Sequence, residues 1–212
     1  MLKYAYKIRR YDVMENYQKL MENEIAGLSG DKPTLLLQCC CAPCSSAVLE
    51  RLCRHFKLKL YFYNPNIYPA AEYEKRLAQF DKLLAHPDFK SDIEIIPASY
   101  EPEKFYEAAK GLEDEKEGGK RCEQCFILRL NETAKKAREL GADYFCTTLT
   151  VSPHKNSELL NKIGIAAEKQ YGVKFLRSDF KKKEGYKRST ELSNELDLYR
   201  QNYCGCEYSI WF

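Results

Sequence analysis

The chain has 212 residues, of which 44% are hydrophobic and 31% are charged, a balance that is too apolar for a disordered protein. No run approaches the roughly 18 apolar residues of a membrane helix, and no apolar segment follows the basic N-terminus. Neither membrane insertion nor secretion is therefore expected, and the predicted location is cytoplasmic. The net charge of +3, from 34 basic and 31 acidic residues, excludes no class of partner.

In chain order, helical patterns alternate with short apolar runs. Residues 1–30 are expected to form an N-terminal helical extension, with an apolar stripe from Met14 to Leu28 that Gly30 ends. The strands predicted after it lie at 35–37, 58–63, 93–96, 144–146 and 173–176. Ser45 and Ser46 are expected to cap the helix after the first strand. The other predicted helices lie at 71–84, 102–110, 125–140, 156–170 and 190–199.

This alternation predicts an α/β fold in a single domain over residues 31–212, with a Rossmann-like parallel sheet and helices on both faces. Ligands bind such sheets at the carboxyl ends of the strands. The chemically unusual segments CCCAPC, NPNIYP and TLTVSPHKN and a basic loop each follow a predicted strand. The sequence therefore predicts a cysteine-lined site at the C-terminal ends of the strands.

The ten cysteines carry the strongest chemical signal. Without an export signal they do not indicate a disulfide framework, because the cytosol keeps thiols reduced. Eight of them fall into three tight groups, at 39–44, 122–125 and 204–206. Two C-x-x-C pairs with further thiols indicate a metal site, and ligands scattered over the loops of an α/β sheet favour an iron–sulfur cluster over zinc. Cys39, Cys53 and Cys146 are expected to be structural.

Two thiol-based alternatives stay open. Cys41-Ala-Pro-Cys44 between a strand and a helix is also typical of a thiol–disulfide oxidoreductase, although that class explains neither the second C-x-x-C nor the C-terminal pair. Cys204-Gly-Cys206 can form a small strained disulfide that is easily reduced, or it can supply metal ligands. A Gly-rich phosphate loop is missing, which argues against a nucleotide cofactor.

Further candidate residues lie at other strand ends. Asn64, Asn66 and Tyr68 can bind a base or sugar, or they can simply build the turn. His154 is the best acid–base candidate, and the neighbouring Lys155 and Asn156 are candidate substrate-binding residues, although Asn156 can equally cap a helix. A basic block over 174–188 can bind phosphates or form a solvated loop; its candidate nucleic-acid-binding residues are Lys181, Lys182, Lys183, Lys187 and Arg188.

Six segments in order resemble the cobalamin-independent epoxyqueuosine reductases of the QueH type. They are LLLQCCCAPCS at 35–45, YFYNPNIYPAAEYEKR at 61–76, GGKRCEQCFILRL at 118–130, TTLTVSPHKN at 147–156, FKKKEGYKRSTELS at 180–193 and YRQNYCGCEYS at 199–209. The resemblance covers about residues 33–209 and implies a Rossmann-like fold related to adenine-nucleotide hydrolases. It also implies a tRNA-modifying oxidoreductase that removes the epoxide oxygen of epoxyqueuosine at the wobble position, giving queuosine and water.

The resemblance further implies roles for individual cysteines. Cys40, Cys41, Cys122 and Cys125 match the residues that hold a 4Fe–4S cluster. Cys204 and Cys206 match a C-x-C treated as a redox-active pair or as ligands near the cluster. Some members carry Asp where this chain has Cys44. The resemblance implies a second metal, a mononuclear iron, near this position, with Cys44 as a candidate ligand. The implied partners are a tRNA with a queuosine-type anticodon and an unidentified electron donor, and His154 is the hypothetical proton donor.

Overall fold

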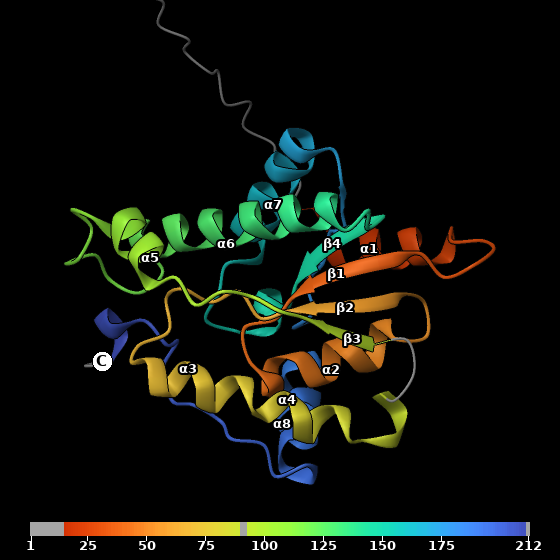
Figure 1. Cartoon of the computed structure of the whole chain (residues 1–212). Helices are drawn as coiled ribbons and strands as arrows, with labels where there is room; N and C mark the ends of the chain where they lie inside the picture. Colours follow the sequence, from red (N-terminus) through yellow and green to blue (C-terminus); the bar gives the residue numbers. More distant parts are fainter. Residues whose placement is uncertain (1–14, 90–92, 211–212) are drawn as a thin grey trace, which may run out of the picture.

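The computed structural model describes residues 15–89 and 93–210 and contains one five-stranded sheet (Figure 1). All strands are parallel and lie in the order β3-β2-β1-β4-β5, which is the Rossmann order for five strands. The strands are β1 Thr34–Gln38, β2 Lys57–Tyr61, β3 Ile93–Ile96, β4 Tyr144–Thr147 and β5 Lys174–Phe175. The predicted α/β fold is confirmed.

The described helices cover both faces of the sheet, with α6 and α7 on one side and α2, α4 and α8 on the other (Figure 1). They are α1 Tyr17–Ala26, α2 Ala42–Leu52, α3 Ala70–Leu77, α4 Gln79–Leu84, α5 Pro102–Ala109, α6 Lys120–Glu139, α7 Ser157–Tyr171 and α8 Gly185–Glu195. Short 3₁₀ turns are η1 Pro87–Phe89, η2 Thr148–Val151 and η3 Glu207–Ser209. Within residues 15–89 and 93–210, no helix has the length and apolar character to cross a membrane.

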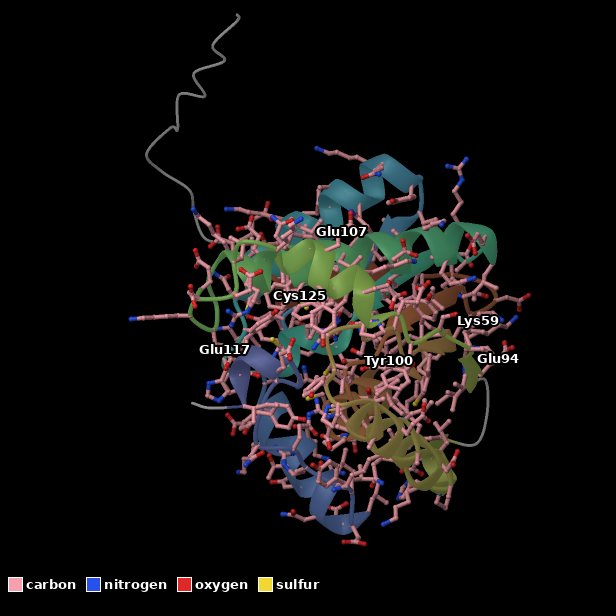
Figure 2. The ribbon with its side chains drawn as sticks, turned by 60° about the vertical axis from the view of Figure 1, so that its left-hand side comes forward. Lys59, Glu94, Tyr100, Glu107, Glu117 and Cys125 are labelled. Atoms are coloured by element: carbon pink, nitrogen blue, oxygen red, sulfur yellow. The ribbon has the colours of Figure 1, made fainter. Side chains whose placement is uncertain are left out.

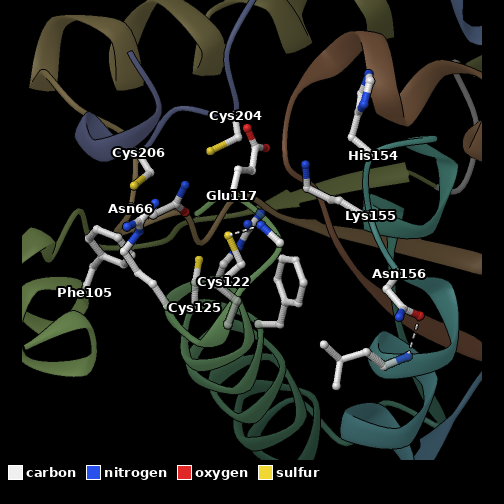
Figure 3. Close-up of a pocket in the computed structure, with 15 residues that line it drawn as sticks. Asn66, Phe105, Glu117, Cys122, Cys125, His154, Lys155, Asn156, Cys204 and Cys206 are labelled. Atoms are coloured by element: carbon white, nitrogen blue, oxygen red, sulfur yellow. Dashed lines mark hydrogen bonds between the residues drawn. The ribbon is translucent and has the colours of Figure 1, made fainter. Parts of the chain in front are cut away.

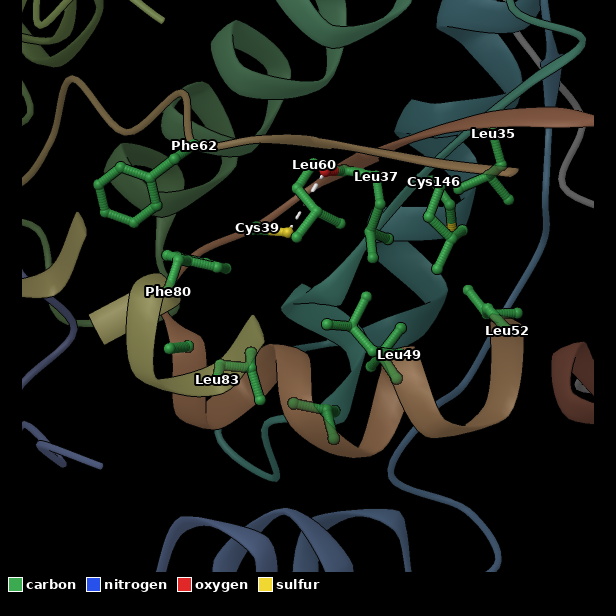
Figure 4. Packing of buried hydrophobic residues seen from close by; sticks show 14 of the residues in the cluster. Leu35, Leu37, Cys39, Leu49, Leu52, Leu60, Phe62, Phe80, Leu83 and Cys146 are labelled. Atoms are coloured by element: carbon green, nitrogen blue, oxygen red, sulfur yellow. Dashed lines mark hydrogen bonds between the residues drawn. The ribbon is translucent and has the colours of Figure 1, made fainter. Parts of the chain in front are cut away.

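Strand β1 contributes side chains to two cores because successive residues of a strand face opposite sides. Leu35 and Leu37 join the cluster that α2 and α4 cover, shown in Figure 4. Leu36 joins the cluster that Ala134 of α6 and Ala167 of α7 complete. Burial on both sides explains why β1 is continuously apolar. It also holds the strand in place, so that the cysteines after Gln38 lie at the carboxyl end of the sheet.

Several helices differ from prediction, and the single helix predicted at 71–84 is divided into α3 and α4. Helix α2 begins at Ala42, and its N-cap is Cys41, not Ser45 or Ser46, because the Cys41 sulfur accepts the backbone N–H of Cys44 at 3.4 Å. Helix α6 begins at Lys120, five residues before the predicted start. Helix α8 spans Gly185–Glu195 instead of 190–199 and so includes part of the basic block.

The predicted N-terminal helix is present as α1, and residues 1–14 of the expected extension lie outside the described residues. Asn16 caps α1, and Met21 is 2% exposed within the same core cluster as Leu35 and Leu37. Glu24 accepts hydrogen bonds from Tyr144 and Lys174, so the helix rests on the edge formed by β4 and β5. Helix α1 therefore packs against the α/β domain and contributes to its core.

Candidate metal and thiol site

The loop after β1 brings three sulfurs together. The Sγ atoms of Cys40, Cys41 and Cys44 all lie within 4.8 Å of one another, a spacing that suits ligands of one metal centre. Thr148 fixes the loop: its Oγ1 accepts the backbone N–H of Cys40 at 3.1 Å and lies 3.4 Å from the Cys40 sulfur. The N-terminus of α2 points at these thiols, and its dipole favours their ionised form.

The charges within this three-sulfur group are unequal. Hydrogen bonds from Cys41 and Cys44 hold the pKa of the Cys40 thiol well below its usual range, against the effect of burial. The same hydrogen bond from Cys41 to Cys40 raises the pKa of Cys41 to about 12, and the pKa of Cys44 is also raised. The three thiols therefore differ in how readily they ionise, with Cys40 the most acidic, and metal binding displaces protons from those that become ligands.

Helix α6 supplies the second pair of cysteines. Cys122 lies in the first turn, where its sulfur accepts the backbone N–H of Gly118 at 3.2 Å, and Cys125 follows one turn later. Cys125 is 7% exposed and packs with Cys206 and the α5 residue Phe105. In Figure 2, Cys125 lies among interior side chains and the exposed Glu117 at the edge of the molecule.

The C-terminal segment supplies the third pair. Cys204 and Cys206 are free thiols, and a hydrogen bond from Cys206 lowers the pKa of Cys204 to about 5, with help from the charge of Lys155. The pKa of Cys206 is raised by the same contact. Gly205 between them has φ of +112°, and a Cβ there would lie 2.9 Å from Arg76 Nη1. This backbone therefore requires glycine.

Two adjoining cavities unite the three groups. A cavity of about 90 Å³ is lined by Cys122, Cys125, Cys204 and Cys206 (Figure 3). A larger cavity of about 400 Å³ is lined by Cys40, Cys44 and again Cys204. Arg129 and Lys155 line both cavities, and Cys40 and Cys122 pack against one apolar cluster under them. The predicted cysteine-lined site at the carboxyl edge of the sheet is confirmed, and Cys40, Cys41 and Cys44 form its close group.

Buried arginines surround these thiols. The exposed fractions of Arg76, Arg121 and Arg129 are 2%, 2% and 3%, and each lines one or both cavities. Each also has a buried nitrogen with no hydrogen-bond partner in the described part of the chain. The side-chain oxygens Asn66 Oδ1 and Gln201 Oε1 are buried and unpaired there as well. Buried polar atoms are nearly always hydrogen-bonded, so the three unpaired arginine donors suit an additional, negatively charged acceptor. A cluster held by four thiolates fits that description.

The other candidate residues occupy different positions around the cavities. Asn64 is 1% exposed and hydrogen-bonds the carbonyl of Cys39 and the guanidinium of Arg129. Its side chain therefore contacts other protein groups and does not line either cavity. Asn66 lines the smaller cavity. Tyr68 is 44% exposed, and its carbonyl accepts a hydrogen bond from Tyr203.

The segment after η2 places its three candidates differently. Lys155 reaches toward the cysteines and the exposed His154 turns away from them, although both line the cavities (Figure 3). Burial acts to lower the pKa of Lys155, but the charges of Cys204, Cys40 and Cys44 outweigh it and raise the pKa. Asn156 caps α7 through a hydrogen bond from the backbone N–H of Leu159.

Carboxylates neutralise much of the predicted nucleic-acid-binding block. Lys181 pairs with Asp179 at 3.0 Å, and Lys183 pairs with Glu22. Arg188 contacts three carboxylates, namely Glu50, Glu191 and Glu195. Lys182 and Lys187 are exposed. The block is therefore less positive in three dimensions than along the chain.

The buried arginines were not identified from the sequence. Arg129 had a detectable signal, because it follows Cys125 by four residues in a helical pattern and therefore lies on the same face of α6. Arg76 and Arg121 belong to α3 and α6 and reach the site through the fold. In a single sequence they resemble ordinary surface arginines.

The fold and the site define a Rossmann-like α/β domain with a thiol-rich centre, compatible with metal binding, at the carboxyl edge of its sheet. The family model described as "Epoxyqueuosine reductase QueH" matches residues 35–211, and the chain belongs to this family. Three relatives named epoxyqueuosine reductase QueH show the extent of the similarity. The protein from Streptococcus pyogenes serotype M1 is 43% identical over 96% of this chain and 78% of its own length. Those from Staphylococcus epidermidis and Thermotoga maritima are 43% and 42% identical over 92% and 84% of this chain, and 84% and 90% of their own lengths.

Proposed function

We propose that this chain is an epoxyqueuosine reductase that converts epoxyqueuosine in tRNA to queuosine. Family membership supports the activity. The observation that carries the chemistry is that six cysteines line two adjoining cavities that share Cys204, and that the buried Cys41 sulfur lies within 4.8 Å of two of them, Cys40 and Cys44. The thiol–disulfide oxidoreductase alternative uses Cys41 and Cys44 alone and leaves the other five without a role.

The reaction removes the epoxide oxygen as water and needs two electrons and two protons. Cys204 and Cys206 can supply both electrons by forming a disulfide, and the protons come from the Cys206 thiol and from solvent. An external reductant must then reopen the disulfide. Lys155, whose ammonium faces the thiols, is placed to stabilise the charge that develops on the oxygen as the C–O bond breaks.

The proposed 4Fe–4S ligands are Cys40 and Cys41 from one side and Cys122 and Cys125 from the other. The cluster would supply single-electron transfer, and the second iron would supply a Lewis acid at the epoxide. Cys44 would then be free to ligate the expected second iron. The unpaired buried nitrogens of the arginines around the cavities support a negatively charged occupant.

The larger cavity is the proposed entry for the wobble nucleotide, because its volume of about 400 Å³ lies in the range of small-molecule sites. Tyr186, 41% exposed, and Arg200 line this cavity, with the guanidinium carbon 5.9 Å from the ring centroid. Among residues 15–89 and 93–210, no carboxylate pairs with Arg200. This rim can stack on a neighbouring base and contact a phosphate.

Anaerobically purified protein should contain about four iron and four sulfide ions per chain and convert epoxyqueuosine-containing tRNA to queuosine with a chemical reductant. Cys40→Ala and Cys122→Ala should each lose the cluster and the activity, whereas Cys53→Ala on the far end of α2 should keep both. Zinc in place of iron, or activity that survives Cys122→Ala, would contradict the proposal. More than four irons in the wild type, lowered in Cys44→Ala, would support the second metal.

For the rim, Tyr186→Ala should weaken binding of an anticodon stem-loop by about 1–3 kcal/mol through lost stacking. Arg200→Ala should reduce the slope of log K against log salt concentration by about 1, the amount expected for the loss of one phosphate contact. Lys183→Ala is the matched control, since Glu22 already neutralises that ammonium. Fluorescence anisotropy at several salt concentrations measures all three. Equal affinities for Tyr186→Ala and wild type would exclude the rim from RNA binding.

A further inference from the structure

Arg129 is a buried cation between the two cysteine-lined cavities. It is 3% exposed, lines both cavities and lies on α6 one turn beyond Cys125 and two turns beyond Cys122. Residues four apart on a helix have neighbouring side chains, with Cβ atoms roughly 5–6 Å apart. The guanidinium therefore lies beside the sulfur that α6 presents to the smaller cavity.

A polar network holds this guanidinium in one orientation. Its Nη2 donates to Asn64 Oδ1 at 2.6 Å. Asn64 in turn donates to the carbonyl of Cys39 at 2.9 Å, and Gln38 donates to Asn64 at 3.3 Å. Thr147 at the end of β4 donates to Gln38 at 2.8 Å. The ends of β1, β2 and β4 thus fix Arg129.

Two features of Arg129 remain unused by this network. Its Nε–H has no acceptor among the described residues, although the side chain is buried. Its positive charge acts on thiols from both sides of the site, because it acts to lower the pKa of Cys40 from the β1–α2 loop and of Cys125 from α6. A planar guanidinium stays charged at any accessible pH and directs its N–H groups rigidly.

We infer that Arg129 is a positioning residue that places a fixed positive charge and a free N–H donor against the cysteine-held cluster and so raises its reduction potential. The inference rests on the proposed iron–sulfur centre. Reduction adds one negative charge to the cluster, so a nearby cation stabilises the reduced form more than the oxidised form. Hydrogen bonds to cluster sulfurs act in the same direction.

The test measures the midpoint potential of anaerobically purified, iron-loaded protein by redox titration, following the electron paramagnetic resonance signal of the reduced cluster. Arg129→Gln removes the charge and should shift the midpoint to lower potential. Arg129→Lys retains the charge, and its midpoint potential should lie between those of Arg129→Gln and wild type. Arg138→Gln is the matched control, because it makes the same change at an exposed position of the same helix.

The outcomes separate this inference from the proposed function. A wild-type protein without an iron–sulfur cluster overturns both. A cluster present at equal iron content in wild type and Arg129→Gln, with the midpoint unchanged relative to Arg138→Gln, overturns the role of Arg129 alone. A loss of activity with an unchanged potential also contradicts it, since a merely structural role would give that result.

A second measurement does not depend on the stability of Arg129→Gln. Pulsed electron paramagnetic resonance on the reduced wild-type protein, labelled with ¹⁵N-arginine, should detect a nitrogen coupled to the cluster. The coupling should disappear in Arg129→Lys, which distinguishes Arg129 from Arg121, whose Nη1 donates to backbone carbonyls of the preceding loop. No arginine coupling in the wild type would overturn the inference.

Discussion

Single residues determine how closely the thiols approach one another, and Gly205 is the clearest case. Its positive φ allows the chain to turn between Cys204 and Cys206, and a Cβ there would meet Ile67 and Arg76, whose guanidinium donates to the carbonyl of Cys204. A side chain at this position would meet a buried guanidinium. The geometry of the C-terminal thiol pair therefore depends on a residue that has no chemistry of its own.

We expect Gly205→Ala to lower the free energy of unfolding by about 1–3 kcal/mol, because the change adds backbone strain and a close contact. Gly30→Ala is the control: its φ of +80° is also unfavourable for alanine, but its Cβ would meet nothing within 4 Å. Urea unfolding of the two variants separates the free-energy cost of a positive φ from the cost of the close contact with Arg76. A smaller loss for Gly205→Ala than for Gly30→Ala would contradict this account.

Lys155 and His154 are adjacent, yet they should differ in their effect on turnover. Lys155→Met removes the ammonium that faces the thiols and should lower kcat by about 10²-fold or more, the range for loss of one preorganised charge at a reacting oxygen. His154→Ala changes an exposed ring that turns away from the cysteines. Single-turnover assays on epoxyqueuosine-containing tRNA measure both. If His154→Ala is the inactive variant, the proton-donor hypothesis made from the sequence is supported instead.

At the scale of elements, the two helices that begin at the site orient its sulfurs. Helix α2 starts with a cysteine as its N-cap, and α6 carries Cys122, Cys125 and Arg129 along one face. The sequence predicted both C-x-x-C pairs at helix starts. It placed the start of α6 five residues late, because the charged loop before Lys120 has no side-chain cap that marks the boundary.

Helix α1 provides an element whose attachment depends on pH. Burial acts to raise the pKa of Glu24, but hydrogen bonds from Lys174 and Tyr144 outweigh it and lower the pKa below the ordinary 4.5. A carboxyl with a lowered folded-state pKa stabilises the fold above its unfolded-state pKa, and this stabilisation is lost as the pH falls through the folded-state pKa. Helix α1 should therefore loosen below about pH 4.5.

Limited proteolysis within residues 17–26, measured between pH 3 and pH 7 with an acid-stable protease, tests this attachment. Wild type should become more susceptible at low pH. Glu24→Gln should be more susceptible at neutral pH and should change less with pH, since it lacks the titrating group. Identical pH profiles for the two proteins would show that other groups attach α1.

At the scale of the whole molecule, the fold followed from periodicity and the site followed only in part. The alternation of apolar runs predicted a parallel sheet, and the position of the cysteines after strands predicted where they meet. Arg76 and Gln201 reach the cavities through contacts between elements distant in the chain, which local patterns do not encode. The neutralisation of Arg188 by Glu50 likewise depends on the packing of α8 on α2.

A metal centre between these elements should stabilise the whole domain. The candidate ligands come from the β1–α2 loop and the start of α6, so a bound cluster links segments about 80 residues apart in the chain. A group that binds only the folded state adds stability by mass action. Removal of iron with a chelator should lower the Tm of the wild type but not that of Cys122→Ala. An equal Tm before and after removal would argue against a cluster held by both segments.

Cys204 lines both cavities, and the segment that carries it follows every strand of the sheet. During synthesis on the ribosome, the β1–α2 loop and α6 emerge earlier and can adopt their places while this wall is still missing. A cluster held by these two segments, as proposed above, would then be accessible from the side that the C-terminal segment later covers. The order of the segments along the chain would thus allow the centre to form before the last thiols arrive.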